Sequence, residues 1–212
     1  MIHPHTRIHF INEEMGYGVF ATQFIPKGTI TYVKDSLELE ITLEDYALHT
    51  PQMQQQIEKY SYIDERGVRI VSWDFAKYVN HCCECNTMST GYGFEIAIRD
   101  IYPGEEITDE YGIFNMEQDM VLECKKPGCR GLVCSADLDR YHAKWDAGLK
   151  EALRHFNEVE QPLAPFLEED TAIALENYLS GKKQYKSVYH LKNKKGSLAA
   201  AQMNGIGHHM KS

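Results

Sequence analysis

Short runs in which apolar and polar residues alternate dominate the first half of the chain. Alternation with a period of two places the apolar side chains on one face of a β-strand. Turn formers such as Pro26-Lys27-Gly28 and Pro103-Gly104 separate these runs. The predicted strands are residues 7–11, 29–33, 37–41, 68–73, 94–99 and 107–111.

A different pattern begins at Thr42. This residue is placed as a helix N-cap, and acidic side chains follow it in the first turn. The segment up to Tyr60 is polar, rich in glutamine and interrupted by Pro51. It predicts short helix and loop.

The last third of the chain is predicted to be helical. Apolar residues recur at intervals of three and four between about 137 and 156, which indicates an amphipathic helix. A second helix is expected at about 169–180, with Gly181 as its C-cap. The sequence therefore predicts an α+β fold, in which a β-rich part precedes a helical extension.

The composition is that of a globular protein. The chain has 212 residues, enough for one domain with an extension or for two small domains. No apolar run reaches the length of a transmembrane helix, and the first residues lack the features of a signal peptide. We therefore expect a soluble, intracellular protein that does not contact a membrane.

The net charge of −9 is unevenly distributed. Seven lysines follow position 180, whereas no acidic residue follows Glu176, so the rest of the chain is more acidic than the total suggests. An acidic body favours a basic peptide as partner, and a merely solvated acidic surface is the alternative.

The six cysteines lie in two clusters. Residues 80–86 read Asn-His-Cys-Cys-Glu-Cys-Asn, and residues 124–134 hold the other three cysteines. In an intracellular protein they are more often thiols or metal ligands than disulfides. A hydrolase that uses His81 with Cys82 or Cys83 is disfavoured, because neighbours on a strand point to opposite faces.

Four segments in order resemble the motifs of the SET-domain protein-lysine N-methyltransferases. They are Gly16-Tyr17-Gly18-Val19-Phe20-Ala21, Asn80-His81-x-Cys83-x-x-Asn86, Gly104-Glu105-Glu106-Ile107-Thr108-x-x-Tyr111, and Cys124-x4-Cys129-Arg130-Gly131. The last is similar to a divergent form of the family's post-SET cysteine tail. The resemblance covers residues 7–134 and implies a β-rich SET fold of small antiparallel sheets with a threaded pseudoknot.

The resemblance over residues 7–134, together with the sequence patterns beyond it, divides the chain into four parts. Residues 1–114 would form the SET domain, with a helical or loop insert at about 42–66. Residues 115–135 would form the post-SET-like segment and 136–181 the helical extension. Residues 182–212 would be a basic, flexible tail.

The implied activity is methyl transfer from S-adenosylmethionine to the ε-amine of a lysine. In this family Tyr111 would be the catalytic residue. The cofactor would be held by Gly16, Tyr17, Gly18, Asn80, His81 and Tyr111. Tyr78 and Phe114 are the candidates for the walls of the substrate channel. The substrate would be a lysine-containing protein or a basic peptide, and contact with nucleic acid is not required.

Two positions depart from the family pattern. Asp109 stands where many members carry an aromatic residue that tunes how many methyl groups are added. Leu122 stands where the first cysteine of the tail would fall. The resemblance still implies one structural zinc, held by Cys83, Cys85, Cys124 and Cys129, with Cys134 as a substitute for Cys85. These departures favour the alternative of a catalytically weak SET-like binding or scaffold module.

Overall fold

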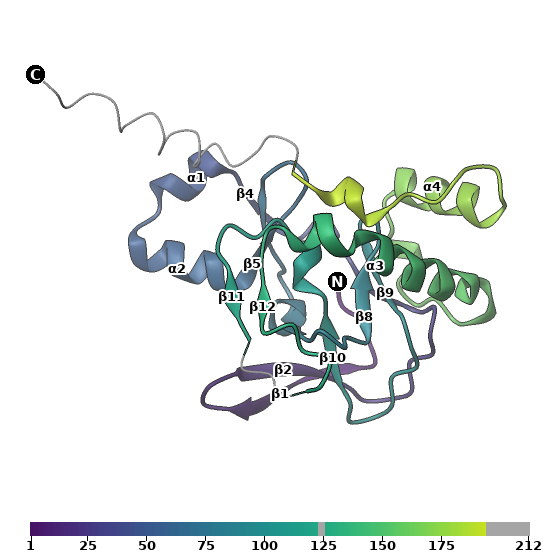
Figure 1. The fold of residues 1–212 in the computed structure, drawn as a ribbon, viewed down its shortest axis with the longest axis horizontal. Helices are drawn as coiled ribbons and strands as arrows, with labels where there is room; N and C mark the ends of the chain where they lie inside the picture. The colour runs from purple at the N-terminus through teal and green to yellow at the C-terminus, as the bar shows by residue number, and fades with distance from the viewer. Residues whose placement is uncertain (123–125, 194–212) are drawn as a thin grey trace, which may run out of the picture.

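The computed structural model describes residues 1–122 and 126–193. Its helices fall into two groups, one inserted between strands and one after the last strand (Figure 1). The α-helices are α1 (Leu43–Leu48), α2 (Pro51–Tyr60), α3 (Asp137–Arg154) and α4 (Glu169–Leu179). The short 3-10 helices are η1 (Phe75–Tyr78), η2 (Tyr111–Ile113), η3 (Phe156–Glu158), η4 (Ala164–Phe166) and η5 (Val188–Leu191).

The strands are short and are divided among small sheets. They are β1 (Thr6–Asn12), β2 (Gly16–Ala21), β3 (Ile30–Val33), β4 (Leu39–Ile41), β5 (Ser61–Ile63), β6 (Arg69–Val71), β7 (Asn80–His81), β8 (Thr87–Ser89), β9 (Phe94–Ala97), β10 (Glu106–Asp109), β11 (Met120–Val121) and β12 (Leu132–Val133). The sheets have the orders β1-β2-β10-β7, β3-β9-β8, β4-β6-β5 and β11-β12. Strands β7 and β10 pair in parallel, and the other strand pairs of the described residues are antiparallel.

The insert contains two capped helices where the sequence predicts helix interrupted by loop. The hydroxyl of Thr42 accepts a hydrogen bond from the backbone N–H of Asp45, as expected for an N-cap. Pro51 marks the break between the two helices and begins the second one. Thr50 caps that helix, and proline is well tolerated in a first turn, because its missing N–H would have no partner there.

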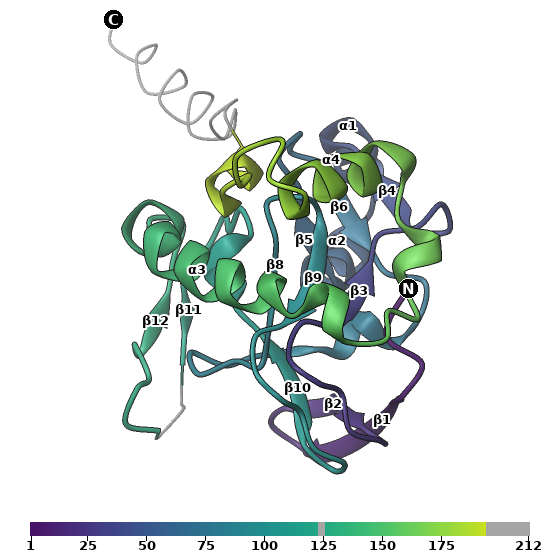
Figure 2. The same cartoon turned by 90° about the vertical axis from the view of Figure 1, so that its right-hand side faces the viewer.

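The C-terminal helices share a hydrophobic core with the sheets. Leu149 and Leu153 of α3 are buried in the same cluster as Phe94 and Ile96 of β9. Figure 2 shows α3 crossing in front of the β8–β9 region, with α4 on the same side of the molecule. The sequence prediction of helices near 137–156 and 169–180 agrees with α3 and α4 to within two residues.

The chain beyond α4 returns to the body of the protein. Val188 is fully buried in the core. The amide of Asn115 donates to the carbonyl of Leu191 (2.9 Å), and the backbone N–H of Asn193 donates to Asn115 Oδ1 (2.7 Å). This part of the tail, which was expected to be flexible, therefore packs against α3 and η2, and residues 194–212 lie outside the described residues.

The α+β class with small, mostly antiparallel sheets and a helical C-terminal part is confirmed. In the described part of the chain, no helix is long and apolar enough to cross a membrane.

His3 makes the stability of this fold dependent on pH. Its ring is 3% exposed, and its Nδ1 accepts a hydrogen bond from the backbone N–H of His5 (3.2 Å). Burial, together with the nearby His5, lowers the pKa of His3 to about 4. Protonation would place a charge in the core and remove the acceptor, so the neutral ring is the form that stabilises the fold.

We predict that the stability contributed by neutral His3 is lost as the pH falls below the unfolded-state pKa. The unfolded chain takes up this proton near pH 6.5, whereas the folded chain does so only near pH 4. Between pH 7 and 5 the free energy of unfolding should therefore drop more for the native chain than for His3→Gln, by roughly 2 kcal/mol. Urea denaturation at both pH values measures this difference, and parallel pH curves for the two proteins would contradict it.

Candidate active site

The parallel pairing of β7 with β10 brings two distant motifs together. Asn80 lies opposite Thr108, and His81 lies opposite Asp109. Just beyond β10, the backbone N–H of Tyr111 donates to His81 Nδ1 (3.2 Å). The motif around Asn80 and the tyrosine that follows β10 thus share one site.

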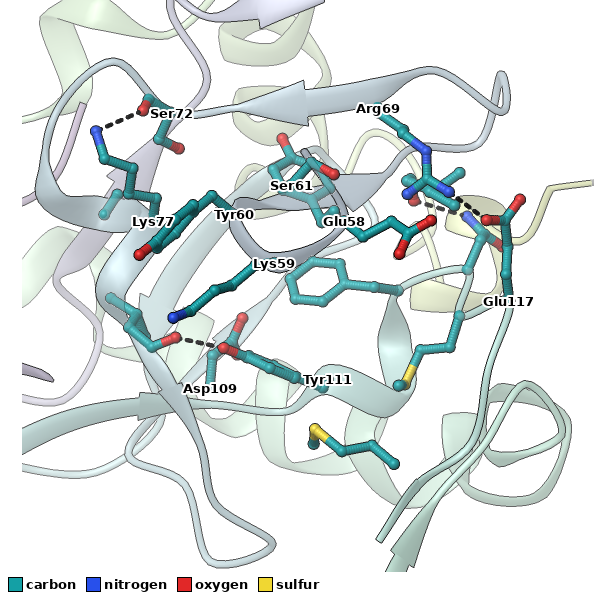
Figure 3. Close-up of a pocket in the computed structure, with 18 of the residues that line it drawn as sticks. Glu58, Lys59, Tyr60, Ser61, Arg69, Ser72, Lys77, Asp109, Tyr111 and Glu117 are labelled. Carbon is teal, nitrogen blue, oxygen red and sulfur yellow. Dashed lines mark hydrogen bonds and ion pairs between the residues drawn. The ribbon is translucent and has the colours of Figure 1, made fainter. Parts of the chain in front are cut away.

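Tyr111 is held at both its backbone and its hydroxyl group. The hydroxyl donates to the carbonyl of Val79 (2.6 Å; Figure 3). Burial and the nearby Asp109 and Glu95 carboxyls raise the pKa of Tyr111 above its usual value. Tyr111 therefore presents a fixed, neutral hydroxyl group.

The glycine turn at the start of β2 is tied to the same site through Asn80. The Asn80 amide donates to the carbonyl of Tyr17 (3.1 Å) and to Glu106 Oε1 (2.9 Å). A Cβ added at Gly18 would lie 2.7 Å from Glu106 Oε1 and 3.1 Å from Asn80 Nδ2. A side chain at position 18 would displace these groups, and the φ of 73° at Gly16 favours glycine there.

His81 is neutral and has a defined tautomer. Burial lowers its pKa, and its Nδ1 accepts the hydrogen bond from Tyr111. The proton is therefore on Nε2, which lies 3.4 Å from Cys83 Sγ. Since burial raises the pKa of Cys83, this sulfur is a thiol and not the thiolate that a hydrolase would need.

A pocket of about 400 Å³ opens beside the Tyr111 hydroxyl group. Figure 3 shows Lys59, Asp109 and Tyr111 pointing into it. Its lining comes from the insert, from β10 and from the chain after Tyr111: Tyr32, Glu58, Lys59, Tyr60, Ser61, Tyr62, Ile63, Arg69, Ser72, Ala76, Lys77, Val79, Glu95, Asp109, Tyr111, Phe114, Asn115, Met116, Glu117, Gln118 and Met120.

The two predicted channel residues have different positions. Phe114 lines the pocket and stacks on Tyr62, with ring centroids 5.0 Å apart. Tyr78 is not among the lining residues. It packs edge-on between Tyr17 (5.9 Å) and Tyr60 (5.5 Å), and so links the glycine turn to the pocket wall.

A buried ion pair fixes the chain behind Tyr111, and the sequence analysis did not identify it. Both oxygens of Glu110 accept hydrogen bonds from the Arg130 guanidinium group, each at 2.7 Å. Glu110 is 1% exposed. Arg130 also lies 3.3 Å from Asp137 at the start of α3. No sequence signal pairs Glu110 with Arg130, because these two residues are 20 positions apart.

The cysteines do not assemble a metal site in the described part of the chain, where no group of three or more His, Cys, Asp or Glu side chains could hold a metal ion. Cys83 and Cys129 accept hydrogen bonds from the adjacent backbone N–H groups of Arg130 and Gly131, both at 3.4 Å. Cys124 lies outside the described residues.

Neither candidate for the fourth zinc ligand joins a metal-binding group among the described residues. Cys85 is buried in the hydrophobic core. Cys134 is buried next to Asp137, with its Sγ 3.4 Å from Oδ1. The expected zinc set is therefore not supported.

Comparison with known proteins identifies the class. Residues 16–112 match the family model described as SET domain. A curated relative is the variant-silencing SET domain-containing protein of Plasmodium falciparum (isolate 3D7), which is 33% identical over 135 residues. The match covers 55% of this chain and 5% of that much longer protein. Residues 16–112 belong to the SET-domain family.

Two solved structures are similar to part of this chain. The methyltransferase domain of human histone-lysine N-methyltransferase SETMAR is 16% identical, with a TM-score of 0.43 over 63% of this chain and 58% of that chain. KRYPTONITE, in complex with mCHG DNA and SAH, is 18% identical, with a TM-score of 0.43 over 61% of this chain and 29% of that chain.

We predict that Arg130→Leu destabilises the protein by about 3–5 kcal/mol, because it leaves the buried Glu110 carboxylate without its charged partner, with the backbone N–H of Gly112 as its remaining hydrogen-bond donor (2.8 Å). Urea unfolding measures the loss. Arg140→Leu is the matched control: Arg140 also faces Asp137, at 3.9 Å, but its side chain is 62% exposed, so this change should cost less than about 1 kcal/mol. Equal effects of the two substitutions would contradict a special role for the buried pair.

Proposed function

We propose that this chain transfers a methyl group from S-adenosylmethionine to the ε-amine of a lysine in a protein substrate. One observation carries the proposal: three motifs converge on Tyr111. Its backbone N–H reaches His81, its hydroxyl group faces the pocket, and Asn80, next to His81, holds the glycine turn. A fold that kept the SET architecture only for binding would not require all three.

The glycine turn and its neighbours suit the cofactor. Gly18 carries no side chain where Asn80 and Glu106 approach, and the Tyr17 ring is about half exposed beside it. An exposed aromatic face and a close backbone approach favour a cationic, partly planar ligand. When bound, S-adenosylmethionine would supply the methyl group on its sulfonium centre. Gly16, Tyr17, Gly18, Asn80 and His81 would hold it.

The pocket on the other side of Tyr111 suits the acceptor amine. Lysine has a free pKa near 10.4, and the amine must be neutral when it attacks. Aromatic walls from Tyr60, Tyr62 and Phe114 reduce the water around it. The Tyr111 hydroxyl group, fixed by Val79, would orient the reacting groups. No metal has a part in this chemistry as proposed, and a structural zinc is not part of the proposal.

The substrate class follows from charge. The protein is acidic overall, and acids such as Glu58 and Glu117 line the pocket. Such a surface attracts lysine-rich, basic segments of other proteins. A second candidate, a SET-like binding module, is favoured by Asp109, which stands in place of the usual aromatic residue.

We predict saturable binding of S-adenosylmethionine, measured by titration calorimetry. Asn80→Ala should weaken it by about tenfold, because the amide no longer holds the turn. Tyr111→Phe should bind the cofactor nearly as well as the native chain but slow methyl transfer to a lysine-rich protein mixture by about 10²-fold or more.

Two outcomes would separate the candidates. Cofactor binding without methyl incorporation into any lysine would favour the binding module. No cofactor binding by the folded protein would refute the methyltransferase proposal.

A further inference from the structure

The guanidinium group of Arg130 lies between the end of β10 and helix α3. It donates to both oxygens of Glu110, each at 2.7 Å, and lies 3.3 Å from Asp137 Oδ2. Its Cζ atom lies 5.2 Å from the centroid of the Tyr141 ring and 5.9 Å from that of the Trp145 ring. Asp137, Tyr141 and Trp145 belong to α3. The helix therefore holds one side of the guanidinium group, and Glu110 holds the other.

Glu110 fixes the backbone on both sides of Tyr111. Its Oε1 accepts a hydrogen bond from the backbone N–H of Gly112 (2.8 Å), which caps the 3-10 turn η2 that starts at Tyr111. Its own backbone N–H donates to Asp109 Oδ1 (2.7 Å). The N–H of Tyr111, between these two bonds, donates to His81. The direction in which the Tyr111 side chain leaves the backbone therefore depends on where Glu110 is held.

Helix α3 also touches the turn directly, at Gly112. A Cβ added there would lie 2.9 Å from Trp145 Cη2 and 3.0 Å from both Asp137 Cβ and Glu110 Oε1. No side chain fits between the turn and the helix. Helix α3 lies beyond residues 16–112, which match the SET domain. The support of the turn therefore comes from the part of the chain that follows the family match.

We propose that Arg130 is a positioning residue of the active site: through Glu110 it sets the turn that aims the Tyr111 hydroxyl group, and α3 is the support against which Arg130 is held. The inference rests on the proposed function only for the reaction that Tyr111 serves. It gives the helical extension a part in catalysis, although no residue of α3 lines the pocket.

An arginine suits this role better than a lysine. Its planar fork bonds both oxygens of a carboxylate and so fixes the plane of the Glu110 carboxyl group, whereas a lysine is a point charge that leaves this group free to rotate. The α3 rings of Tyr141 and Trp145 attract the cation from the other side. Since a small displacement of a reacting group slows a reaction out of proportion to its size, loss of the fork should affect the reaction more than binding.

The test compares Arg130→Lys and Glu110→Gln with the native full chain. The first keeps the charge but loses the fork, and the second keeps an acceptor for Gly112 but loses the charged partner. Methyl incorporation from S-adenosylmethionine into a lysine-rich protein mixture gives kcat and the KM for the cofactor. We expect each variant to lower kcat by about 10- to 100-fold, and to leave this KM within about threefold of the native value.

Amide hydrogen exchange supplies a readout that needs no activity. If Arg130 positions the turn, exchange of the Tyr111 amide should quicken by about tenfold or more in both variants, and by a larger factor than exchange of Ile96 in the buried strand β9. A substitution that only lowered global stability would act through unfolding of the whole chain and would not single out Tyr111.

Matched substitutions make the result specific. Gly112→Ala pushes the turn away from α3 without changing any charge, and should act like Arg130→Lys. Gly148→Ala, within α3, adds a Cβ that meets nothing within 4 Å and should leave kcat unchanged. Arg140→Lys should also leave it unchanged, because the Arg140 side chain is 62% exposed and only approaches Asp137, at 3.9 Å.

The inference is overturned if Arg130→Lys and Glu110→Gln keep the native kcat, or if Tyr111 and Ile96 exchange faster by the same factor. Circular dichroism confirms that each variant is folded, and if one is not, the other and Gly112→Ala decide. A native chain that methylates no lysine refutes the proposed function. The exchange of Tyr111 then decides the positioning role alone, and native rates in all the variants refute it.

Discussion

The site depends on a parallel pairing of two very short strands. Strand β7 has two residues and pairs with only the end of β10, so backbone hydrogen bonds alone would hold it weakly. Side chains of the adjoining segment reinforce it. The Asn86 amide donates to the carbonyl of Glu106 (2.7 Å), and the backbone N–H of Thr108 donates to Asn86 Oδ1 (2.9 Å). Asn86 is 1% exposed, so these bonds form in a medium where losing them is costly. The Asn86 amide thus adds two hydrogen bonds that hold β10 in place. Tyr111, which follows β10, is thereby placed where its backbone N–H reaches His81.

The elements could be predicted from the sequence wherever the signal was local. Alternation gave strands β1, β3, β6 and β9, and three- and four-residue spacing gave α3 to within two residues. Pro51 does mark a break in the helical segment, because α1 ends at Leu48. That Pro51 also begins α2 becomes clear only from the capping bond of Thr50.

Only part of the site could be predicted, because the sequence signals that identify its residues are also local. The glycine turn, Asn80, His81 and Tyr111 are recognisable because each belongs to a contiguous motif. The contacts of Glu110 with Arg130, and of Asp109 with Glu95, join residues brought together only by folding. The sequence marked Asp109 as a departure from a family pattern, but it gave no sign that the carboxyl group of Glu95 interacts with it. The spacing of Cys85 suggested a zinc ligand, but its side chain lies in the hydrophobic core and no metal-binding group is found among the described residues.

Asn115 connects three parts of the chain through one side chain. Its amide donates to the carbonyls of Ile63 and Asp64 in the insert (both 3.1 Å) and of Leu191 near the C-terminal end of the described chain (2.9 Å). It also lines the pocket. The pocket wall at Asn115 and the segment around Leu191 therefore share one set of hydrogen bonds. Movement of either one away from Asn115 breaks bonds that also hold the other. Thermodynamic reciprocity then applies: any occupant that tightens the pocket also protects the segment around Leu191 from opening, and a partner that captures this segment changes the affinity of the pocket by the same factor.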